Sequence, residues 1–159
     1  VASGALRLRP GVRELFDECS ASGLSMAIVT TTSHGNVDAL LSAQVGADWK
    51  ARFAAVVCAE DAPVKKPDPQ AYRLALVRLR LRAEQAVAIE DSAMGLAAAT
   101  AAGIPVVITR SRYFPDDHVT GALAVGPSLG TRAGWSPALD ARPGKVGLAD
   151  IRRWHETRG

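Results

Sequence analysis

Apolar positions repeat with helical spacing in several segments of the chain and run together over short stretches between them. The helical patterns predict helices over residues 12–19, 37–41, 72–79, 92–102 and 148–155. Apolar runs of strand length predict strands over residues 25–30, 53–60, 86–91 and 104–109, with a weaker candidate at 121–126. Gly23 and Gly103 stand where the first and fourth helices are expected to end, and Pro69 suits the first turn of the third.

The order of these segments predicts the fold class. Apolar strands without polar interruption need cover on both faces, and helices separate the strands along the chain. We therefore expect an α/β fold with a Rossmann-like, three-layer parallel sheet and helices on both faces. A chain of 159 residues is long enough for one packed core, so we expect a single domain over residues 1–159. Its α/β core would occupy residues 11–109, and residues 110–159 would add a C-terminal strand and helices.

Composition and charge exclude some classes of function. The net charge is only +3, the basic residues are spread along the chain, and aromatic residues make up 5% of it, which disfavours a nucleic-acid-binding surface. The chain has no apolar run of about 18 residues and no signal-peptide pattern at its start, so we expect a cytoplasmic protein that does not bind membranes. Cys19 and Cys58 lack the spacing of a metal or redox motif and are expected to be buried thiols.

Polar side chains follow three of the predicted strands. The first strand is followed by four hydroxyl residues, Thr30, Thr31, Thr32 and Ser33. The second leads to Lys65 and Lys66, and the third ends in Glu90, Asp91 and Ser92. Because ligands of open parallel sheets bind at the carboxyl ends of the strands, these groups are expected on one edge. Hydroxyl and amide donors, a cation and carboxylates that hold Mg²⁺ are what a phosphate monoester site requires.

Each of these signals also has an ordinary structural explanation. Ser33 taken alone is typical of a helix N-cap, and Asp91 or Ser92 could cap the next helix. Lys66 would then be a solvated loop lysine, and Glu90 a charge at the rim of the domain.

The chain resembles haloacid dehalogenase-type hydrolases, and among them the CbbY-like sugar-phosphate phosphatases. The resemblance is carried by three ordered segments, "AIVTTTSHGNVDALL", "VKKPDPQAYRLAL" and "AIEDSAMGLAAATAAGIPVVIT", within residues 6–109. It implies a Mg²⁺-dependent phosphatase of small phosphorylated sugars, such as a pentulose bisphosphate. It also implies that Lys66 neutralises the phosphoryl group, and that Asp91 binds Mg²⁺ with Glu90 as a secondary ligand. The phosphate and nearby sugar hydroxyls would be held by Thr30, Thr31, Thr32, Ser33, His34, Gly35 and Asn36. His34 could add positive charge when protonated, or be a solvated loop histidine.

One part of the family pattern is absent from the sequence. The family uses an Asp nucleophile in a DxDGT-like motif on its first strand, and forms an aspartyl-phosphate there. This chain has no such motif, and Asp116 and Asp117 lie in a polar stretch that follows no buried strand. The chain begins with Val1, and residues 1–10 resemble the end of the family's helical cap and its linker. We therefore expect a C-terminal portion that lacks the nucleophile, the cap and the central strand, and that is inactive by itself.

The expected loss of a central strand bears on stability. In the family this strand lies between the strands that correspond to residues 25–30 and 86–91. It would share on the order of ten backbone hydrogen bonds, each worth about 0.5–1.5 kcal/mol, against a domain stability of about 5–15 kcal/mol. We expect the chain alone to be marginally stable, to pair the two flanking strands abnormally, or to take the strand from a partner. The sequence does not indicate an oligomeric state.

Two alternative functions remain open. The chain could be a non-catalytic module that binds phosphate ligands or another subunit through the exposed central edge. It could also be a haloacid dehalogenase, although Lys66 with the paired carboxylates favours the phosphatase because a dehalogenase holds no metal.

Overall fold

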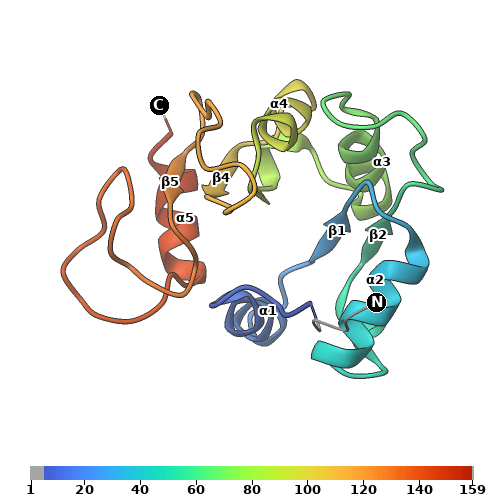
Figure 1. The fold of residues 1–159 in the computed structure, drawn as a ribbon, viewed down its shortest axis with the longest axis horizontal. Coiled ribbons are helices and arrows are strands. Elements are labelled where there is room, and N and C mark those ends of the chain that lie inside the picture. The colour runs from blue at the N-terminus through green and yellow to red at the C-terminus, as the bar shows by residue number, and fades with distance from the viewer. Residues whose placement is uncertain (1–5, 159) are drawn as a thin grey trace.

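The computed structural model describes residues 6–158 and shows an α/β fold (Figure 1). Its strands are β1 (Ala27–Val29), β2 (Ala55–Val57), β3 (Ala88–Glu90), β4 (Val106–Thr109) and β5 (Ala124–Gly126). Its α-helices are α1 (Val12–Ala21), α2 (His34–Gln44), α3 (Gln70–Leu79), α4 (Ala93–Ala101) and α5 (Leu148–Glu156). Two short 3₁₀ helices, η1 (Trp49–Arg52) and η2 (Ala83–Gln85), were not predicted. The predicted order of helices and strands is confirmed, but each strand is shorter than its apolar run.

The strands form two separate parallel sheets. In the first, β1 pairs with β2 so that Ala27 lies opposite Ala55. In the second the order is β3-β4-β5, with Ala88 opposite Val106 and Val107 opposite Ala124. Because all these pairs are parallel, the side chains that follow β1, β2 and β3 start from carboxyl ends, where the site was expected.

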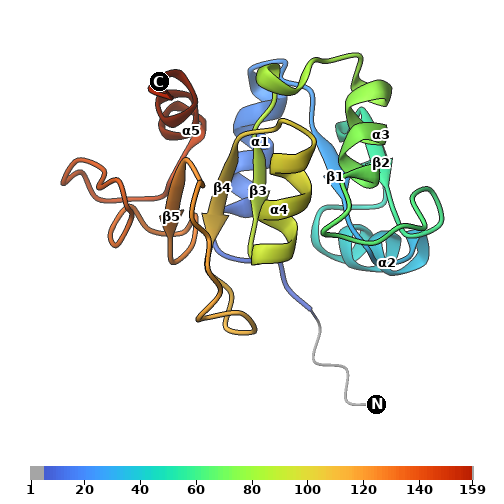
Figure 2. The same cartoon turned by 90° about the horizontal axis from the view of Figure 1, so that it is seen from above.

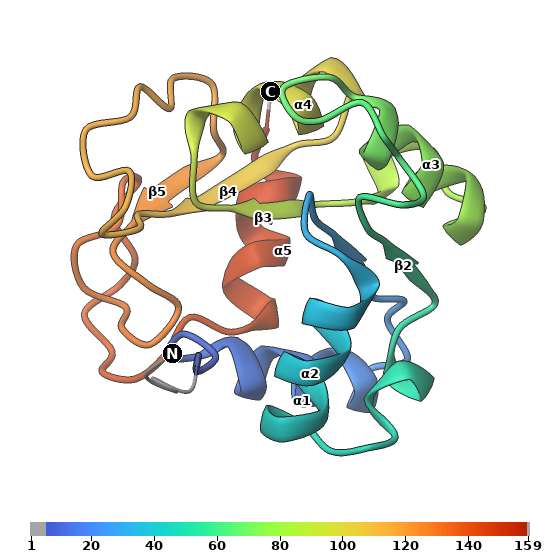
Figure 3. The same ribbon diagram turned by 45° about the vertical axis from the view of Figure 1, so that its right-hand side comes forward.

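Helices cover both faces of the sheets (Figure 3). On one face, α4 and α3 pack on the strands, with Leu96 and Tyr72 in one apolar cluster with Val106. On the other face α1 and α5 pack on the second sheet, where Leu15, Ile151 and Val107 share a cluster, and α2 covers the first sheet. This arrangement confirms the predicted three layers.

The edges of β1 and β3 that face each other are not paired. No backbone hydrogen bond joins these two strands within the described residues, and Figure 2 shows them as separate ribbons. A cavity of about 730 Å³ lies between the sheets and is lined largely by apolar side chains from both, including Met26, Val29, Val87 and Ile104. The expected interruption of the sheet is therefore present, and abnormal pairing of the two flanking strands is not seen.

The segments on either side of the core are anchored to it. In the N-terminal segment, the Arg9 guanidinium donates to the Thr109 hydroxyl and carbonyl at 2.8 and 2.9 Å, and also to the carbonyls of Arg110 and Pro127. In the C-terminal segment, the rings of Trp135 and Trp154 stack with centroids 4.8 Å apart in the core. Both rings belong to the apolar cluster that also contains Leu15 of α1 and Val107 of β4.

Two predictions from composition can be compared with the structure. Cys19 and Cys58 are both buried and form no disulfide, as expected. Within residues 6–158, none of the helices combines the length and the apolar character that a membrane crossing requires.

Candidate active site

Lys66 links the carboxyl ends of β1 and β3. Its ammonium donates to the Val29 carbonyl at 3.1 Å and forms an ion pair with the Glu90 carboxylate. The two side chains are only 12% and 9% exposed, so the pair is largely desolvated. A buried charge is tolerated when it is paired and hydrogen-bonded, as both of these are. Lys66 is therefore a fixed cation, and the interpretations of Lys66 as a solvated loop residue and of Glu90 as a rim charge are wrong.

Tyr72 on α3 is the third member of this cluster. Its hydroxyl donates to the same Glu90 oxygen that accepts from Lys66, and its ring lies 4.9 Å from the Lys66 ammonium nitrogen. Burial, and then the Glu90 charge, raise the pKa of the Tyr72 hydroxyl far above its ordinary value, so the hydroxyl stays a donor. The sequence pattern had placed Tyr72 only on the apolar face of a helix. Its polar end could not be assigned a partner from spacing alone.

Glu90 lies against the start of α4. A Cβ atom at Gly95 would overlap the Glu90 carboxylate, so a glycine is needed at this position for the carboxylate to lie there. The helix itself begins as predicted for a capped helix, because the Ser92 hydroxyl accepts the Gly95 amide at 3.1 Å. Asp117 accepts the Ala93 amide at 2.7 Å and adds a second cap, which was not predicted.

Asp91 supplies the carboxylate that could bind a metal ion. It is half-buried, and its charge also contributes to the raised pKa of Tyr72, which places it near the cluster. Within residues 6–158 its side chain forms no hydrogen bond or ion pair. Mg²⁺ prefers a few carboxylates together with water and phosphate oxygens. Asp91 fits that requirement, whereas one oxygen of Glu90 is already taken by Lys66 and Tyr72, which suits Glu90 to the secondary position.

The hydroxyl residues after β1 form an ordered turn into α2. The Thr30 amide donates to Val57 at 2.9 Å, which extends the pairing of β1 with β2 by one residue. Ser33 caps α2 by accepting the Asn36 amide at 3.2 Å, as its ordinary interpretation predicted. The Asn36 side chain donates to the Thr32 hydroxyl at 3.0 Å. Thr31 and Gly35 are exposed, and the Thr31 side chain forms no hydrogen bond within the described residues.

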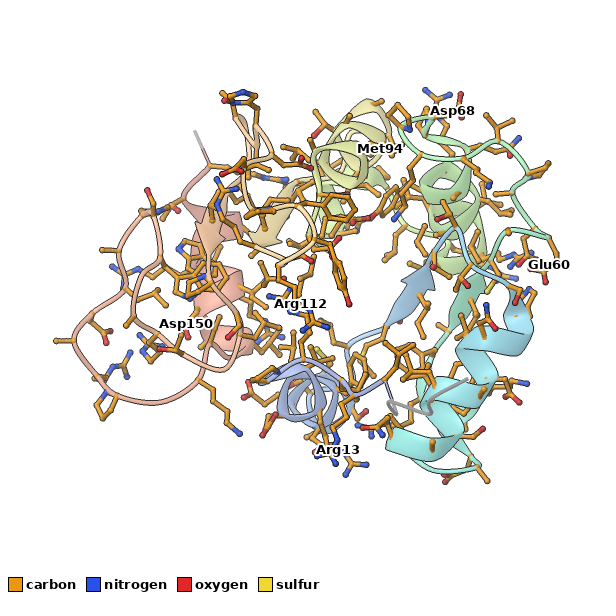
Figure 4. All side chains as sticks on the ribbon, viewed as in Figure 1. Arg13, Glu60, Asp68, Met94, Arg112 and Asp150 are labelled. Carbon is orange, nitrogen blue, oxygen red and sulfur yellow. The ribbon has the colours of Figure 1, made fainter. Side chains whose placement is uncertain are left out.

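His34 forms its hydrogen bonds with the loop after β2 and not with the Lys66 cluster. Its ring donates to Asp61 at 2.6 Å, and its amide lies 3.2 Å from both carboxylate oxygens of Glu60, which is labelled in Figure 4. The side chain is 48% exposed. No hydrogen bond joins residues 30–36 to the side chains of Lys66, Glu90 or Asp91 within the described chain. In the part of the chain that the structure describes, hydrogen bonds connect residues 30–36 to the Lys66 cluster only through the backbone of Val29, the residue before Thr30. The Val29 carbonyl accepts a hydrogen bond from Lys66.

Comparison with known proteins identifies the family of this chain. Residues 1–103 match the haloacid dehalogenase-like hydrolase family. The chain belongs to this family. A family relative, the plasmid protein CbbY of Cupriavidus necator, is 46% identical over 159 residues, which cover 98% of this chain and 62% of that protein. The chain thus spans less than two thirds of the length of this relative.

Crystal structures of family members have the same fold. CbbY from Rhodobacter sphaeroides, as a mutant in complex with xylulose 1,5-bisphosphate, superposes with a TM-score of 0.81 at 34% identity, covering 94% of this chain and 61% of that chain. CbbY from the same organism in complex with phosphate gives a TM-score of 0.72 at 39% identity, covering 76% of this chain and 54% of that chain.

Proposed function

We propose that this chain forms the larger part of a Mg²⁺-dependent phosphatase of small phosphorylated sugars, with a pentulose bisphosphate as the substrate class. The observation that carries the proposal is the position of Lys66, held between the carboxyl ends of β1 and β3 by the Val29 carbonyl and the Glu90 carboxylate. A cation fixed at this edge can stabilise charge that develops on a transferring phosphoryl group without reorganising during the reaction. The complexes of CbbY with xylulose 1,5-bisphosphate and with phosphate support the substrate class.

The residues of the chain take separate roles in this proposal. The turn formed by residues 30–36 would hold phosphate and sugar oxygens, because it offers hydroxyl groups next to the N-terminus of α2. Asp91 would hold Mg²⁺ with Glu90 as its neighbour, and the ion would supply charge neutralisation at the phosphate. Tyr72 and Gly95 would keep the Glu90 carboxylate against Lys66.

The sequence contains no DxDGT-like motif that could supply the nucleophile of the proposed reaction. We propose that the nucleophile is an Asp on a strand that lies between β1 and β3 in the complete protein, where it would form an aspartyl-phosphate. Both facing edges are unpaired, and the cavity between them is lined by apolar side chains of both sheets. A parallel strand placed there would end at the edge where Lys66 lies. The chain alone would then bind phosphate esters without hydrolysing them. The cytoplasmic location of the protein stays a prediction.

Phosphate release from xylulose 1,5-bisphosphate tests the proposal in the complete polypeptide that contains this chain. We expect release that requires Mg²⁺ and is abolished in Asp91→Ala. Asp48→Ala, which changes an exposed aspartate before η1, is the matched control and should keep the parent rate. Turnover by Asp91→Ala with an unchanged Mg²⁺ requirement would refute the role of Asp91.

A non-catalytic module that binds phosphate ligands or another subunit is the second candidate, and the unpaired edges of β1 and β3 favour it. In that case the complete polypeptide would bind inorganic phosphate or the sugar bisphosphate but would not hydrolyse the bisphosphate. If calorimetry showed binding of the sugar bisphosphate while no phosphate was released, the binding module would be the correct function and the phosphatase would be ruled out.

A further inference from the structure

Three side chains of different chemistry converge beside the first sheet, outside the Lys66 cluster. They are His34 at the start of α2, Cys58 directly after β2, and Asp61 three residues later. One ligand atom from each, an imidazole nitrogen, the sulfur and a carboxylate oxygen, all lie within 4.8 Å of one another. We infer that these three residues form a binding site for a divalent transition-metal ion of the zinc class. The inference does not rest on the proposed phosphatase activity.

The spacing of the three groups is close to that of a tetrahedral site. With metal–ligand bonds of about 2.0–2.3 Å, tetrahedral donors are separated by about 3.3–3.8 Å. The His34 Nε2 to Asp61 Oδ2 distance is 2.6 Å, so these two atoms must move apart by about 0.7 Å when an ion enters between them. The exposed His34 side chain can make that movement. Three protein ligands leave the fourth position for water.

Two of the three ligands are already held in place. The Cys58 amide donates to Asp61 Oδ2 at 2.9 Å, and Arg78 donates to the other Asp61 oxygen at 2.8 Å. Arg78 also donates to the Val56 carbonyl at 2.7 Å, which fixes its own position relative to β2. Such outer contacts orient ligands and are a regular feature of metal sites. They also keep Asp61 ionised, because the Arg78 hydrogen bond and then the Cys58 amide lower the pKa of Asp61 to about 2.

The chemistry of the ligands selects the class of ion. A thiolate and an imidazole suit zinc and cobalt, whereas Mg²⁺ takes oxygen ligands and is expected at Asp91 instead. Burial raises the pKa of the Cys58 thiol, so sulfur coordination requires the metal to displace the thiol proton. A bound ion would tie the turn after β1 to the loop after β2. It would therefore restrain residues 30–36 from a position outside the Lys66 cluster.

Cobalt alone is a suitable probe, since coordination of a thiolate to Co²⁺ gives a charge-transfer absorption band. The experiment adds Co²⁺ to the chelator-treated complete polypeptide. We expect a band that saturates at one equivalent, resists excess Mg²⁺ and disappears when Zn²⁺ is added. Cys58→Ser should abolish the band, and His34→Ala should weaken Co²⁺ binding tenfold or more. Cys19→Ser and His118→Ala are the matched controls and should bind like the parent.

Several results decide against the site. A parent protein without a charge-transfer band, or a band that survives in Cys58→Ser, overturns the inference. Because Cys58 is fully buried, Cys58→Ser could fail to fold. The His34 side chain is exposed, so His34→Ala serves as the second test. If His34→Ala binds Co²⁺ with the affinity of the parent, the inference is overturned. Asp91→Ala separates this site from the proposed Mg²⁺ site. It should keep the cobalt band whether or not the proposed phosphatase activity is correct.

Discussion

Lys66 forms an ion pair with Glu90 across the interruption between the two sheets. The same ammonium donates to the Val29 carbonyl at the end of β1, so one side chain connects strands that share no backbone hydrogen bond. The connection lies at the carboxyl edge, where phosphate ligands of parallel sheets bind. The geometry of the candidate site therefore depends on side-chain contacts rather than on continuous strand pairing.

Lys66→Ala should lower the rate of phosphate release from xylulose 1,5-bisphosphate by about 100-fold or more, because one fixed electrostatic stabiliser is lost. Lys65→Ala is the matched control, since Lys65 is the exposed neighbour with no ion pair within the described residues. The measurement is the steady-state rate in the complete polypeptide. A Lys66→Ala enzyme with unchanged kcat and a raised KM would assign Lys66 to binding alone.

Tyr72→Phe should lower the free energy of unfolding of the complete polypeptide by about 1.5–3 kcal/mol, because a buried carboxylate loses one hydrogen-bond donor. Tyr113→Phe is the control, because Tyr113 is 67% exposed and, within the described residues, its hydroxyl is hydrogen-bonded only by the neighbouring Arg112. Urea unfolding of both variants measures the difference. Equal stabilities would show that the Tyr72 hydroxyl contributes nothing to holding Glu90.

Alkaline titration tests the same contact by its pH dependence. The pKa of Tyr72 is raised above its ordinary value of 10.0, so the folded protein keeps this proton where an unfolded chain releases it. The stability that this provides is present below pH 10 and is lost as the pH rises further. The phenolate absorbance of the parent and of Tyr72→Phe should coincide until alkaline unfolding begins. An extra phenolate in the folded parent near pH 10 would contradict the contact.

Gly95→Ala should destabilise the complete polypeptide by about 1–3 kcal/mol, because the added methyl group overlaps the Glu90 carboxylate, which Lys66 and Tyr72 hold in place. Replacing a helical glycine by alanine ordinarily stabilises by about 0.5–1 kcal/mol. Gly35→Ala in α2 should show that ordinary gain, because a Cβ there meets nothing closer than 3.9 Å. Thermal or urea unfolding would measure the change in stability of each variant, and the two changes should have opposite signs. An increase in stability in both variants would rule out the overlap at Gly95.

The 159-residue chain expressed alone should unfold in a broad transition at low temperature. The facing edges of β1 and β3 leave backbone groups without partners, and the cavity between them removes apolar contacts from both sheets. Circular dichroism melting of the chain, beside the complete polypeptide, measures the effect. A cooperative, high-temperature transition of the monomeric chain would contradict this expectation.

The sequence predicted the order of helices and strands because that order depends on local periodicity. Leu15 and Cys19 lie on the buried face of α1, as their spacing indicated, and Ser33 and Ser92 cap the helices that they precede. The 3₁₀ helices were missed because three or four residues are too few to show a period. The strands are shorter than their apolar runs, because the apolar pattern marks burial and does not show which residues pair with a neighbouring strand.

The candidate site was predictable in its residue types but not in its contacts. Lys66 and Glu90 are 24 residues apart, and nothing in the loop around Lys66 indicates that it is buried. Tyr72 reaches Glu90 at the end of β3 from a helix, and Asp117 reaches the start of α4 from a loop. The positions of that helix and that loop are set by tertiary packing. The convergence of His34, Cys58 and Asp61 depends on the pairing of β1 with β2, which brings two distant loops together.

The four hydrogen bonds of Arg9 tie the segment before α1 to the second sheet. One guanidinium holds its segment to the ends of β4 and β5, at the same carboxyl edge as Lys66. Removing this one side chain would leave four oxygen acceptors, on Thr109, Arg110 and Pro127, without their donor at the same time.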